Sequence, residues 1–303
     1  MSKIHRIRTI SEVHQTLGLS KPKHPLVSVI TDFHGAQNIN FEGIRFTSDL
    51  YSISLKSDVE GTIYYGRNTY DFQEGTLIFV KPNQVMQYEP GNEQASHDRT
   101  WTLVFHPDLI RKSELGQYID KYSFFEYDAR EALHLSDEEK GAIQNIVNLI
   151  HKEISSNIDR HSQDLIVSNI RLLLDYATRY FDRQFYTRTN LNKDVVIAFE
   201  NVLKTYYQSG KVLSDGIPTV KFLGKEMGIS PYYLSDLLKK ETGRNTIEHI
   251  HFFIIDQAKT KLLISNQTVS TIAYDLGFEY PQHFAKVFKN KTGMSPTEFR
   301  NRN

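Results

Sequence analysis

The spacing of apolar residues changes once along the chain, near Ser136. Before that point, between residues 25 and 105, apolar residues occur in short segments rich in β-branched and aromatic residues. LYSISLKS (50–57) alternates apolar and polar positions, and EGTLIFVKPNQ (74–84) is a turn, a buried strand and a proline stop. Short strands at this spacing are typical of an antiparallel barrel or sandwich. We therefore expect an N-terminal antiparallel β-barrel.

Beyond Ser136 the apolar residues follow the spacing of helices. SDEE (136–139) is a capping box with Ser136 as the N-cap and Glu139 at N3, so a helix begins at this point. We expect two helices over residues 137–182, packed on the barrel, on a partner subunit or on both. Because their apolar surface exceeds what a surface helix needs, we predict a homodimer held mainly by one of them. The apolar stripe of the first helix consists of Ile143, Ile146, Val147, Ile150 and Ile154.

The polar segment FYTRTNLN (185–192) predicts a linker between two domains, residues 1–187 and residues 188–303. The C-terminal domain is expected to be entirely helical. The fold class is therefore multidomain, β plus α, with an N-terminal barrel followed by helices and a C-terminal all-α domain. Within the second domain we expect a helix over 193–208, a loop over 209–218 and a long helix over 246–264.

The C-terminal domain contains an internal repeat. VKFLGKEMG (220–228) aligns without a gap with VSTIAYDLG (269–277), and the helices that follow align with one extra residue in the second copy. Each copy is a short helix, a glycine turn and a second helix that begins at a proline. Glycine suits the turn because it adopts positive φ without a steric cost. The pattern predicts two helix-turn-helix motifs, over residues 220–241 and 269–291.

Two such motifs joined by one rigid helix favour double-stranded DNA as the partner. Recognition helices about 34 Å apart can enter successive major grooves on one face of DNA. Polar residues near the helix starts would then face base edges, and lysines near the helix ends would contact phosphates. A duplicated helical hairpin without a role in DNA binding is the structural alternative. The predicted phosphate contacts are Lys239, Lys240, Lys289 and Lys291.

Composition narrows the function further. The 303 residues include no cysteine, which excludes disulfides, thiolate catalysis and cysteine-ligated metals. The N-terminus lacks an apolar segment of signal-peptide length, and no apolar run could span a membrane, so we expect a cytoplasmic protein. The net charge of zero is divided unevenly, because residues 188–303 hold 16 Lys and Arg against 11 Asp and Glu. A basic C-terminal domain is consistent with a polyanionic partner.

The C-terminal segment 193–302 resembles the DNA-binding domain of the AraC/XylS family of transcriptional regulators. The run AKTKLLISNQTVSTIAYDLGFEYPQHFAKVFKNKTGMSPTEFR (258–300) is similar to the diagnostic pattern of that family over its full length. The resemblance implies that residues near the start of the second helix of each motif contact bases. Asp236 departs from the pattern, because the family commonly has a basic or neutral residue there. The implied base contacts are Tyr232, Ser235 and Asp236 in the first motif, and Pro281, Gln282, His283, Ala285 and Lys286 in the second.

The N-terminal part resembles, in its strand spacing and in EGTLIFVKPNQV (74–85), the cupin-like regulatory domain that often accompanies this module. A metal-binding cupin needs a pair of histidines, a carboxylate and a later histidine, but GTIYYGRNTY (61–70) has no histidine and the late position falls near Met86. We therefore expect no metal and no other cofactor. A small-molecule effector is the expected ligand of the barrel. The aromatic residues that could line its cavity are Tyr51, Tyr64, Tyr65 and Trp101.

Four functions remain to be compared. The first is a sequence-specific transcriptional regulator whose barrel senses an effector or dimerises, and which is not an enzyme. The second is a metal-dependent cupin enzyme with an appended DNA-binding domain, which the missing ligands disfavour. The third, a response regulator, would need alternating parallel strands and helices. In the fourth the barrel no longer senses anything and only dimerises. We favour the first.

Overall fold

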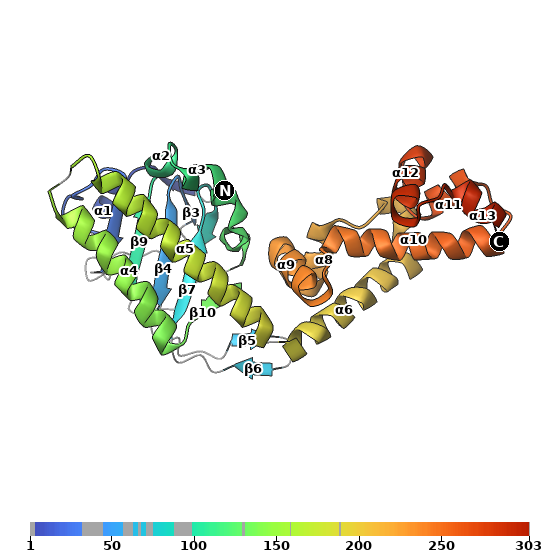
Figure 1. Cartoon of the computed structure of the whole chain (residues 1–303), viewed down its shortest axis with the longest axis horizontal. Coiled ribbons are helices and arrows are strands. Elements are labelled where there is room, and N and C mark those ends of the chain that lie inside the picture. The colour runs from blue at the N-terminus through green and yellow to red at the C-terminus, as the bar shows by residue number, and fades with distance from the viewer. Residues whose placement is uncertain are drawn as a thin grey trace. The chain divides into compact units, whose positions relative to one another are not determined.

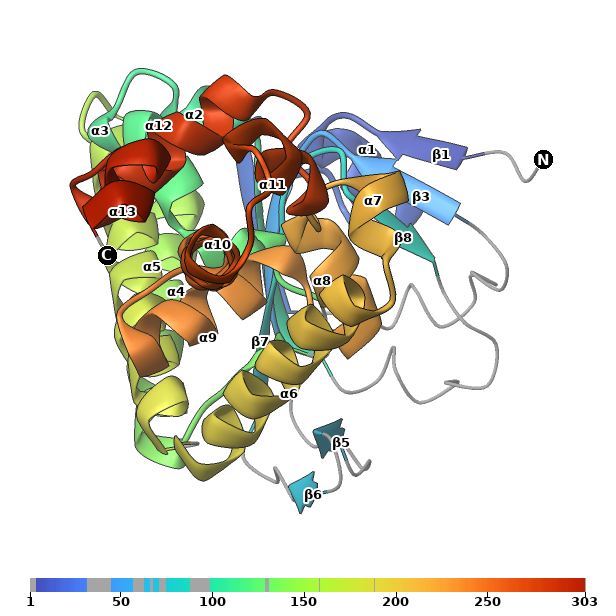
Figure 2. The same cartoon turned by 90° about the vertical axis from the view of Figure 1, so that its right-hand side faces the viewer.

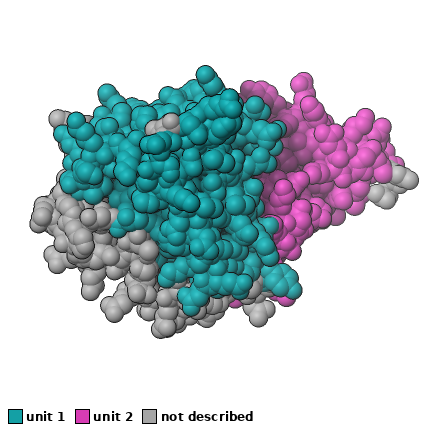
Figure 3. Space-filling view, turned by 60° about the vertical axis from the view of Figure 1, so that its left-hand side comes forward, with its two compact units in different colours: residues 1–186 teal, residues 187–303 magenta. Residues whose placement is uncertain are grey.

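The computed structural model describes residues 4–31, 45–56, 63–65, 68–70, 75–87, 99–128, 131–157, 159–187 and 189–302. The chain divides into two compact units, residues 1–186 and residues 187–303 (Figure 3). The first unit combines β-sheets with helices, and the second is helical. The fold is therefore of the β-plus-α class. Each unit is considered separately below.

The strands of the first unit form three sheets. The five-stranded sheet has the order β10-β7-β4-β9-β2, and all its pairs are antiparallel. Within the described ranges these sheets do not join into one closed barrel. The large sheet consists of β10 (Leu133–His134), β7 (Thr76–Val80), β4 (Tyr51–Lys56), β9 (Arg99–Phe105) and β2 (Val27–Ile30). The second sheet consists of β1 (Ile4–Ile7), β3 (Arg45–Ser48) and β8 (Val85–Gln87). The third consists of β5 (Ile63–Tyr65) and β6 (Asn68–Tyr70).

The large sheet has two chemically different faces. Ile53 lies opposite both Phe79 and Leu103 in the register, so these residues share one face, and Phe79 packs against Phe124 and Phe181. This helix-covered face is apolar. The opposite face combines buried hydroxyl groups, from Ser28, Ser54 and Thr102, with the apolar side chains of Ile30 and Val104. Ile30 and Val104 share an apolar cluster with Ile10 and Val13 of the short helix Ile10–Thr16. The alternation of apolar and polar residues in LYSISLKS therefore separates two buried environments.

Helices complete the first unit, and α4 (Asp137–Ser155) and α5 (Ser162–Thr187) lie side by side across the sheet (Figure 1). The Ser136–Glu139 capping box is present in both directions, as its sequence predicts. The shorter helical elements are α1 (Ile10–Thr16), α2 (Pro107–Ile110), α3 (Glu114–Tyr118) and two 3-10 turns, η3 (Ile119–Lys121) and η4 (Ser123–Glu126).

The apolar stripe of α4 corrects one expectation. All five of its residues, from Ile143 to Ile154, are buried within the chain itself, none being more than 6% exposed. They belong to the core of the first unit and are not free to hold a partner. The large hydrophobic side chains that these two helices do expose are Leu149, Leu165, Leu172 and Tyr186.

The predicted linker, residues 185–192, contains the division between the two units, but its described residues are helical. Residues 185–187 end α5, and α6 (Thr189–Gln208) begins at once, so the described part of the segment is helical. The predicted loop over 209–218 likewise contains a short helix, α7 (Lys211–Asp215), between Gly210 and Gly216. Polar composition alone did not reveal that these residues continue or restart a helix.

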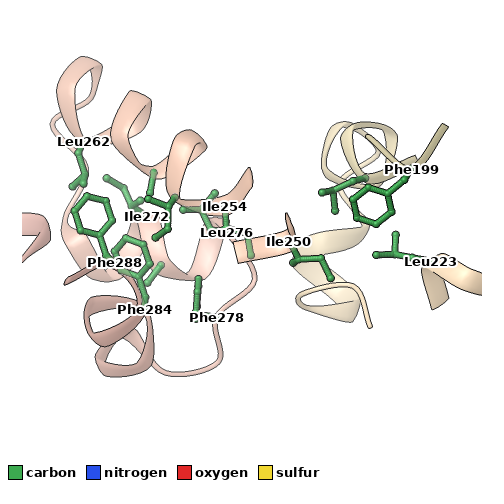
Figure 4. Close-up of a cluster of buried hydrophobic side chains, with 14 of the residues drawn as sticks. Phe199, Leu223, Ile250, Ile254, Leu262, Ile272, Leu276, Phe278, Phe284 and Phe288 are labelled. Carbon is green, nitrogen blue, oxygen red and sulfur yellow. The ribbon is translucent and has the colours of Figure 1, made fainter. Parts of the chain in front are cut away.

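The second unit is built around one long helix, α10 (Thr246–Ile264), whose bounds agree with the predicted 246–264. One helix pair lies at each end of it (Figure 1), and Figure 2 looks along its axis. Buried side chains of α10 join the two groups of apolar residues into one core, as Figure 4 shows. The remaining helices are α8 (Val220–Met227), α9 (Pro231–Thr242), α11 (Val269–Asp275), α12 (Pro281–Thr292) and α13 (Pro296–Arg302).

Candidate nucleic-acid interface

The two helix-turn-helix motifs, α8–α9 and α11–α12, begin in the same way. The Thr219 hydroxyl accepts a hydrogen bond of 3.1 Å from the Phe222 amide. In the second motif the Thr268 hydroxyl accepts one of 3.1 Å from the Thr271 amide. A threonine N-cap satisfies a backbone donor that the first turn of a helix leaves without a partner. Both short helices therefore begin at a position fixed by the sequence.

The turns also agree. Gly228 has φ +67° and Gly277 has φ +88°, a backbone region that favours glycine. Directly after the turn, the Ile229 amide donates to the Gly224 carbonyl at 2.9 Å, and the Phe278 amide donates to the Ala273 carbonyl at 3.0 Å. A Cβ on Gly224 would lie 2.6 Å from the Ile229 carbonyl oxygen, so only glycine fits there without a shift of the backbone.

The recognition helices α9 and α12 end with one shared cap. The Thr242 hydroxyl donates to the Leu238 carbonyl at 2.7 Å, and the Thr292 hydroxyl donates to the Phe288 carbonyl at 2.8 Å. Each threonine also accepts a hydrogen bond from the amide two residues on. A glycine in the left-handed conformation follows each helix. The motifs thus agree in the N-cap of the first helix and the C-cap of the second, but the second helices begin differently, because Ser230 caps α9 with its side chain and Tyr280 makes no such cap on α12.

The second recognition helix exposes a polar face. Gln282, His283 and Lys286 are exposed, whereas Pro281 and Ala285 are half-buried. Phe284 and Phe288, on the opposite side of the helix, are completely buried. The structure therefore brings Gln282, His283 and Lys286 together within the first two turns, where an amide and a cation are suited to base edges.

The first recognition helix exposes different groups. Tyr232 is 51% exposed, and Asp236 is half-buried. Tyr233, which aligns with His283, is buried. Asp236 and Lys240 each have an interaction within the protein. The face that would meet DNA thus combines an aromatic ring with a carboxylate, and it lacks the cation that Lys286 supplies in the second motif.

Ser235 has an intramolecular partner. Its hydroxyl lies 2.9 Å from the hydroxyl of Thr246, which is fully buried at the start of α10. The repeat continues past the glycine that ends each recognition helix, so that Thr246 aligns with Pro296 as Ser235 aligns with Ala285. The same packing position is therefore filled by two hydroxyls in one motif and by two apolar residues in the other. An alignment of the two copies extended by three residues past these glycines would have identified Thr246 from the sequence.

The predicted phosphate contacts lie where the sequence puts them. Lys239 and Lys240 occupy the last turn of α9, and Lys289 and Lys291 the last turn of α12. All four side chains are exposed. Cations at a helix C-terminus also interact favourably with the helix dipole, so part of their role is independent of DNA.

Two histidines of α10 each face a different motif. The ring of His249 packs edge-on against Phe199, and its Nε2 lies 2.7 Å from the Thr242 hydroxyl. Burial, aided by the Arg244 cation, lowers the pKa of His249. Burial also lowers the pKa of His251, with the charges of Lys291 and His283 acting in the same direction. Both side chains are therefore neutral near pH 7 and add no positive charge to the unit.

The predicted effector residues are placed only in part. Tyr51 is half-buried, stacked on Phe105 at 5.0 Å and edge-on to Phe125 at 5.2 Å. Trp101 is fully buried, and its indole N–H has no hydrogen-bond partner in the described part of the chain. By their register Tyr51 and Trp101 both belong to the helix-covered face. The side chains of Tyr64 and Tyr65 lie outside the described residues.

Two other features bear on the class of protein. Among the residues that the structure describes, no three His, Asp or Glu side chains are grouped as metal ligands. Within the same ranges no helix has both the length and the apolar character needed to cross a bilayer.

Comparison with known proteins finds matches over both units. Residues 223–302 match a family described as a helix-turn-helix domain, and residues 58–174 match the AraC-like ligand binding domain. The Arabinose operon regulatory protein of Escherichia coli (strain K12) is 31% identical over 256 residues, covering 82% of this chain and 80% of that protein. The Lactose operon transcription activator of Staphylococcus xylosus is 22% identical over 268 residues, 88% of each chain. Among solved structures, the C-terminal domain of AraT, a response regulator from Geobacillus stearothermophilus, is 26% identical, covering 35% of this chain and 85% of that one, with a TM-score of 0.31.

Proposed function

The chain belongs to the AraC family of transcriptional regulators, and from this we propose that each subunit binds two adjacent major grooves of one DNA site. The family supplies a helix-turn-helix DNA-binding domain and a ligand-binding domain. The observation that supports two-groove binding is the agreement of both motifs in caps, turns and core, on a single linking helix. Two intact recognition helices in one unit give two places for base contacts.

The test is a selection of duplexes from a random pool by the full-length wild-type chain, followed by footprinting on the selected duplex. Two protected segments about 10 base pairs apart on one face of the DNA are expected. One protected segment would contradict two-groove binding. Failure to enrich any sequence would contradict sequence-specific binding altogether.

Base contacts are proposed to differ between the motifs. Gln282 and Lys286 contribute sequence recognition, with His283 beside them, while the first motif contributes mainly docking on the DNA backbone. What supports this is the exposed amide and cation on α12 against Asp236 and the internally bonded Ser235 on α9. The lysines at both helix ends contact phosphates, which carry most of the sequence-independent affinity.

We also propose a homodimer, but with an interface formed by other residues than the buried stripe of α4. The exposed leucines of this helix pair are Leu149 on α4 and Leu165 and Leu172 on α5. We expect Leu149→Glu and Leu172→Glu to give monomers of normal stability in light scattering. Ile146→Glu, in the core, should instead destabilise the subunit. Dimers that persist in both leucine variants would place the interface elsewhere.

The first unit is proposed to bind a small-molecule effector, and two locations compete. Tyr51 and Trp101 lie on the helix-covered face, where the Trp101 N–H, which has no hydrogen-bond partner among the described residues, is the feature that favours a ligand. The other face has the buried Ser54 and Thr102 hydroxyls, 2.9 Å apart, which suit a polar ligand. Once an effector is found, Trp101→Phe and Thr102→Val separate the two: the variant that loses the response identifies the face.

We propose that the protein acts without catalysis and without a metal, in the cytoplasm where its DNA lies. The relatives named above are transcriptional regulators, and this supports the proposal. A metal-dependent cupin enzyme with a DNA-binding domain is the competing function. Metal analysis of untagged protein decides between them, because one tightly bound iron, zinc, manganese or nickel per chain would favour the enzyme.

A further inference from the structure

The two helix-turn-helix motifs are connected at a second place besides α10. A single connecting helix leaves two groups free to bend and twist about it, because only one element carries the link. The second connection is the segment 211–217, which contains α7 and the turn after it. It comes from the chain between α6 and α8, yet it packs on α11 of the second motif.

The contact with the second motif is close. A Cβ placed on Gly277 would lie 2.6 Å from Val212 Cγ2 and 3.0 Å from both the Gly216 carbonyl carbon and the Ile217 nitrogen. Val212 is 5% exposed. Segment 211–217 is therefore in van der Waals contact with the turn between α11 and α12. This contact is a second reason, besides its φ of +88°, why position 277 carries glycine.

The same segment is tied to the first motif. The Tyr206 hydroxyl, on α6, donates a hydrogen bond of 2.8 Å to the Gly216 carbonyl. The Tyr206 ring packs edge-on against Phe222 of α8 at 5.1 Å. Positive φ angles at Gly210 and Gly216 bound the segment and give it a defined shape. Gly216 thus contacts the turn of the second motif, while its carbonyl is held by Tyr206, whose ring packs on the first motif.

We propose that segment 211–217 is a brace that holds the two recognition helices at one distance and orientation, and so sets the spacing between the two half-elements of DNA that the chain binds. This inference rests on the proposed two-groove binding. One inserted base pair moves the second half-element by about 3.4 Å along the axis and turns it by about 35° around it. A braced pair of motifs cannot follow that shift, whereas a pair joined only by α10 can follow part of it.

Two substitutions loosen the brace without touching a proposed DNA contact. Val212→Ala removes the methyl groups that face Gly277, and Tyr206→Phe removes the hydrogen bond to Gly216 while keeping the ring. Leu213→Ala is the matched control, because Leu213 is the next residue of α7 and is 70% exposed. Each variant is compared with the wild type at matched thermal stability.

The first measurement needs no DNA. The chain has no cysteine, so Glu226→Cys on α8 and Asn290→Cys on α12, both at exposed positions, give two specific spin labels. We expect a narrow distribution of distances between the labels in the wild type and in Leu213→Ala. A distribution broadened in Val212→Ala and further in the double variant supports the brace. Unchanged distributions in both would overturn it.

The second measurement uses the duplex selected by the wild type, with and without one inserted base pair between its halves. We expect the insertion to weaken wild-type binding by about tenfold or more, since base contacts of one motif are lost. In the double variant this penalty should fall to about threefold or less, because part of the second motif's contacts is recovered. Equal weakening on both duplexes would show a merely structural role and overturn the brace. If the wild type selects no duplex, the proposed function fails, and the label distances still decide on the brace.

Discussion

At the position where the second recognition helix carries Lys286, the first carries Asp236. At the second residue of each helix, Tyr232 takes the place of Gln282. The core position between them keeps its character, since Leu234 aligns with Phe284 and both are inaccessible, although buried Tyr233 aligns with exposed His283. The copies therefore share the residues that determine the fold and differ in the residues that meet the ligand. The scaffold is therefore common to both copies, whereas the groups on the exposed face of each recognition helix differ.

The shared core gives the largest expected effect. Phe284→Ala should lower the free energy of unfolding by about 3–5 kcal/mol, and Leu234→Ala by about 2–5 kcal/mol, because each leaves a cavity in a closely packed interior. Since both residues belong to one apolar cluster, either change should lower the same cooperative transition of the second unit. Denaturant titration followed by circular dichroism measures it. Two separate transitions would show that the motifs fold as independent units and do not share one core.

Substitutions on the exposed face of the second recognition helix should have the next largest effect, a loss of affinity for DNA. Gln282→Ala and Lys286→Ala should each weaken binding to the selected duplex by about 1–3 kcal/mol and change binding to a scrambled duplex little. Lys289→Ala is the matched variant, expected to weaken both duplexes alike and to reduce the salt dependence by about one charge. Titrations at several salt concentrations distinguish the two patterns. Equal losses on both duplexes for Gln282 and Lys286 would assign them to phosphates.

Sequence patterns were reliable where the cause is local. The capping box at Ser136 and the bounds of α10 depend on side chains within one turn, and both agree with the structure. The isoleucine stripe of α4 was identified correctly as apolar, but periodicity cannot say whether a sheet or a partner covers it. The polar composition of 185–192 predicts a linker and that of 209–218 a loop, and both segments contain helix. In the second of these, Val212 depends on a contact with residue 277, which local composition does not reveal.

Of the candidate site, the sequence located the recognition helices but could not separate packing from contact. The family pattern assigns a base contact to Ser235, whereas the structure shows its hydroxyl bonded to buried Thr246. A short polar side chain near the start of a helix looks the same in sequence whether it faces DNA or a neighbouring helix. Only the second copy, with Ala285 and Pro296 at the matching positions, reveals the difference.

The Ser235–Thr246 pair gives a smaller effect that sharpens this point. Ser235→Ala should lower the free energy of unfolding by about 1–2 kcal/mol, because it leaves the buried Thr246 hydroxyl without a partner. Adding Thr246→Val should restore most of that loss, since both polar groups are then removed. The base preference at the selected site should stay unchanged in both variants. A relaxed preference at one base pair in Ser235→Ala, with stability intact, would instead make Ser235 a base contact.

Substitution of Asp236 is expected to change the affinity for DNA least, but the direction of that change distinguishes two roles of the carboxylate. A carboxylate near DNA phosphates repels them, so removing it should strengthen binding by up to about 1 kcal/mol on any duplex if the first motif docks only on the backbone. If Asp236 instead accepts a hydrogen bond from a cytosine amino group, Asp236→Ala should weaken the selected duplex by about 1–3 kcal/mol while strengthening a scrambled one. We expect the first result, because Asp236 is half-buried and already has an interaction within the protein. Asp256→Ala, an exposed carboxylate on α10, controls for the change in net charge. Titrations of both variants at one fixed salt concentration distinguish the two roles of Asp236. A loss of affinity confined to the selected duplex would show that the first motif also recognises sequence. The two copies would then differ in which bases they contact and not in whether they contact any.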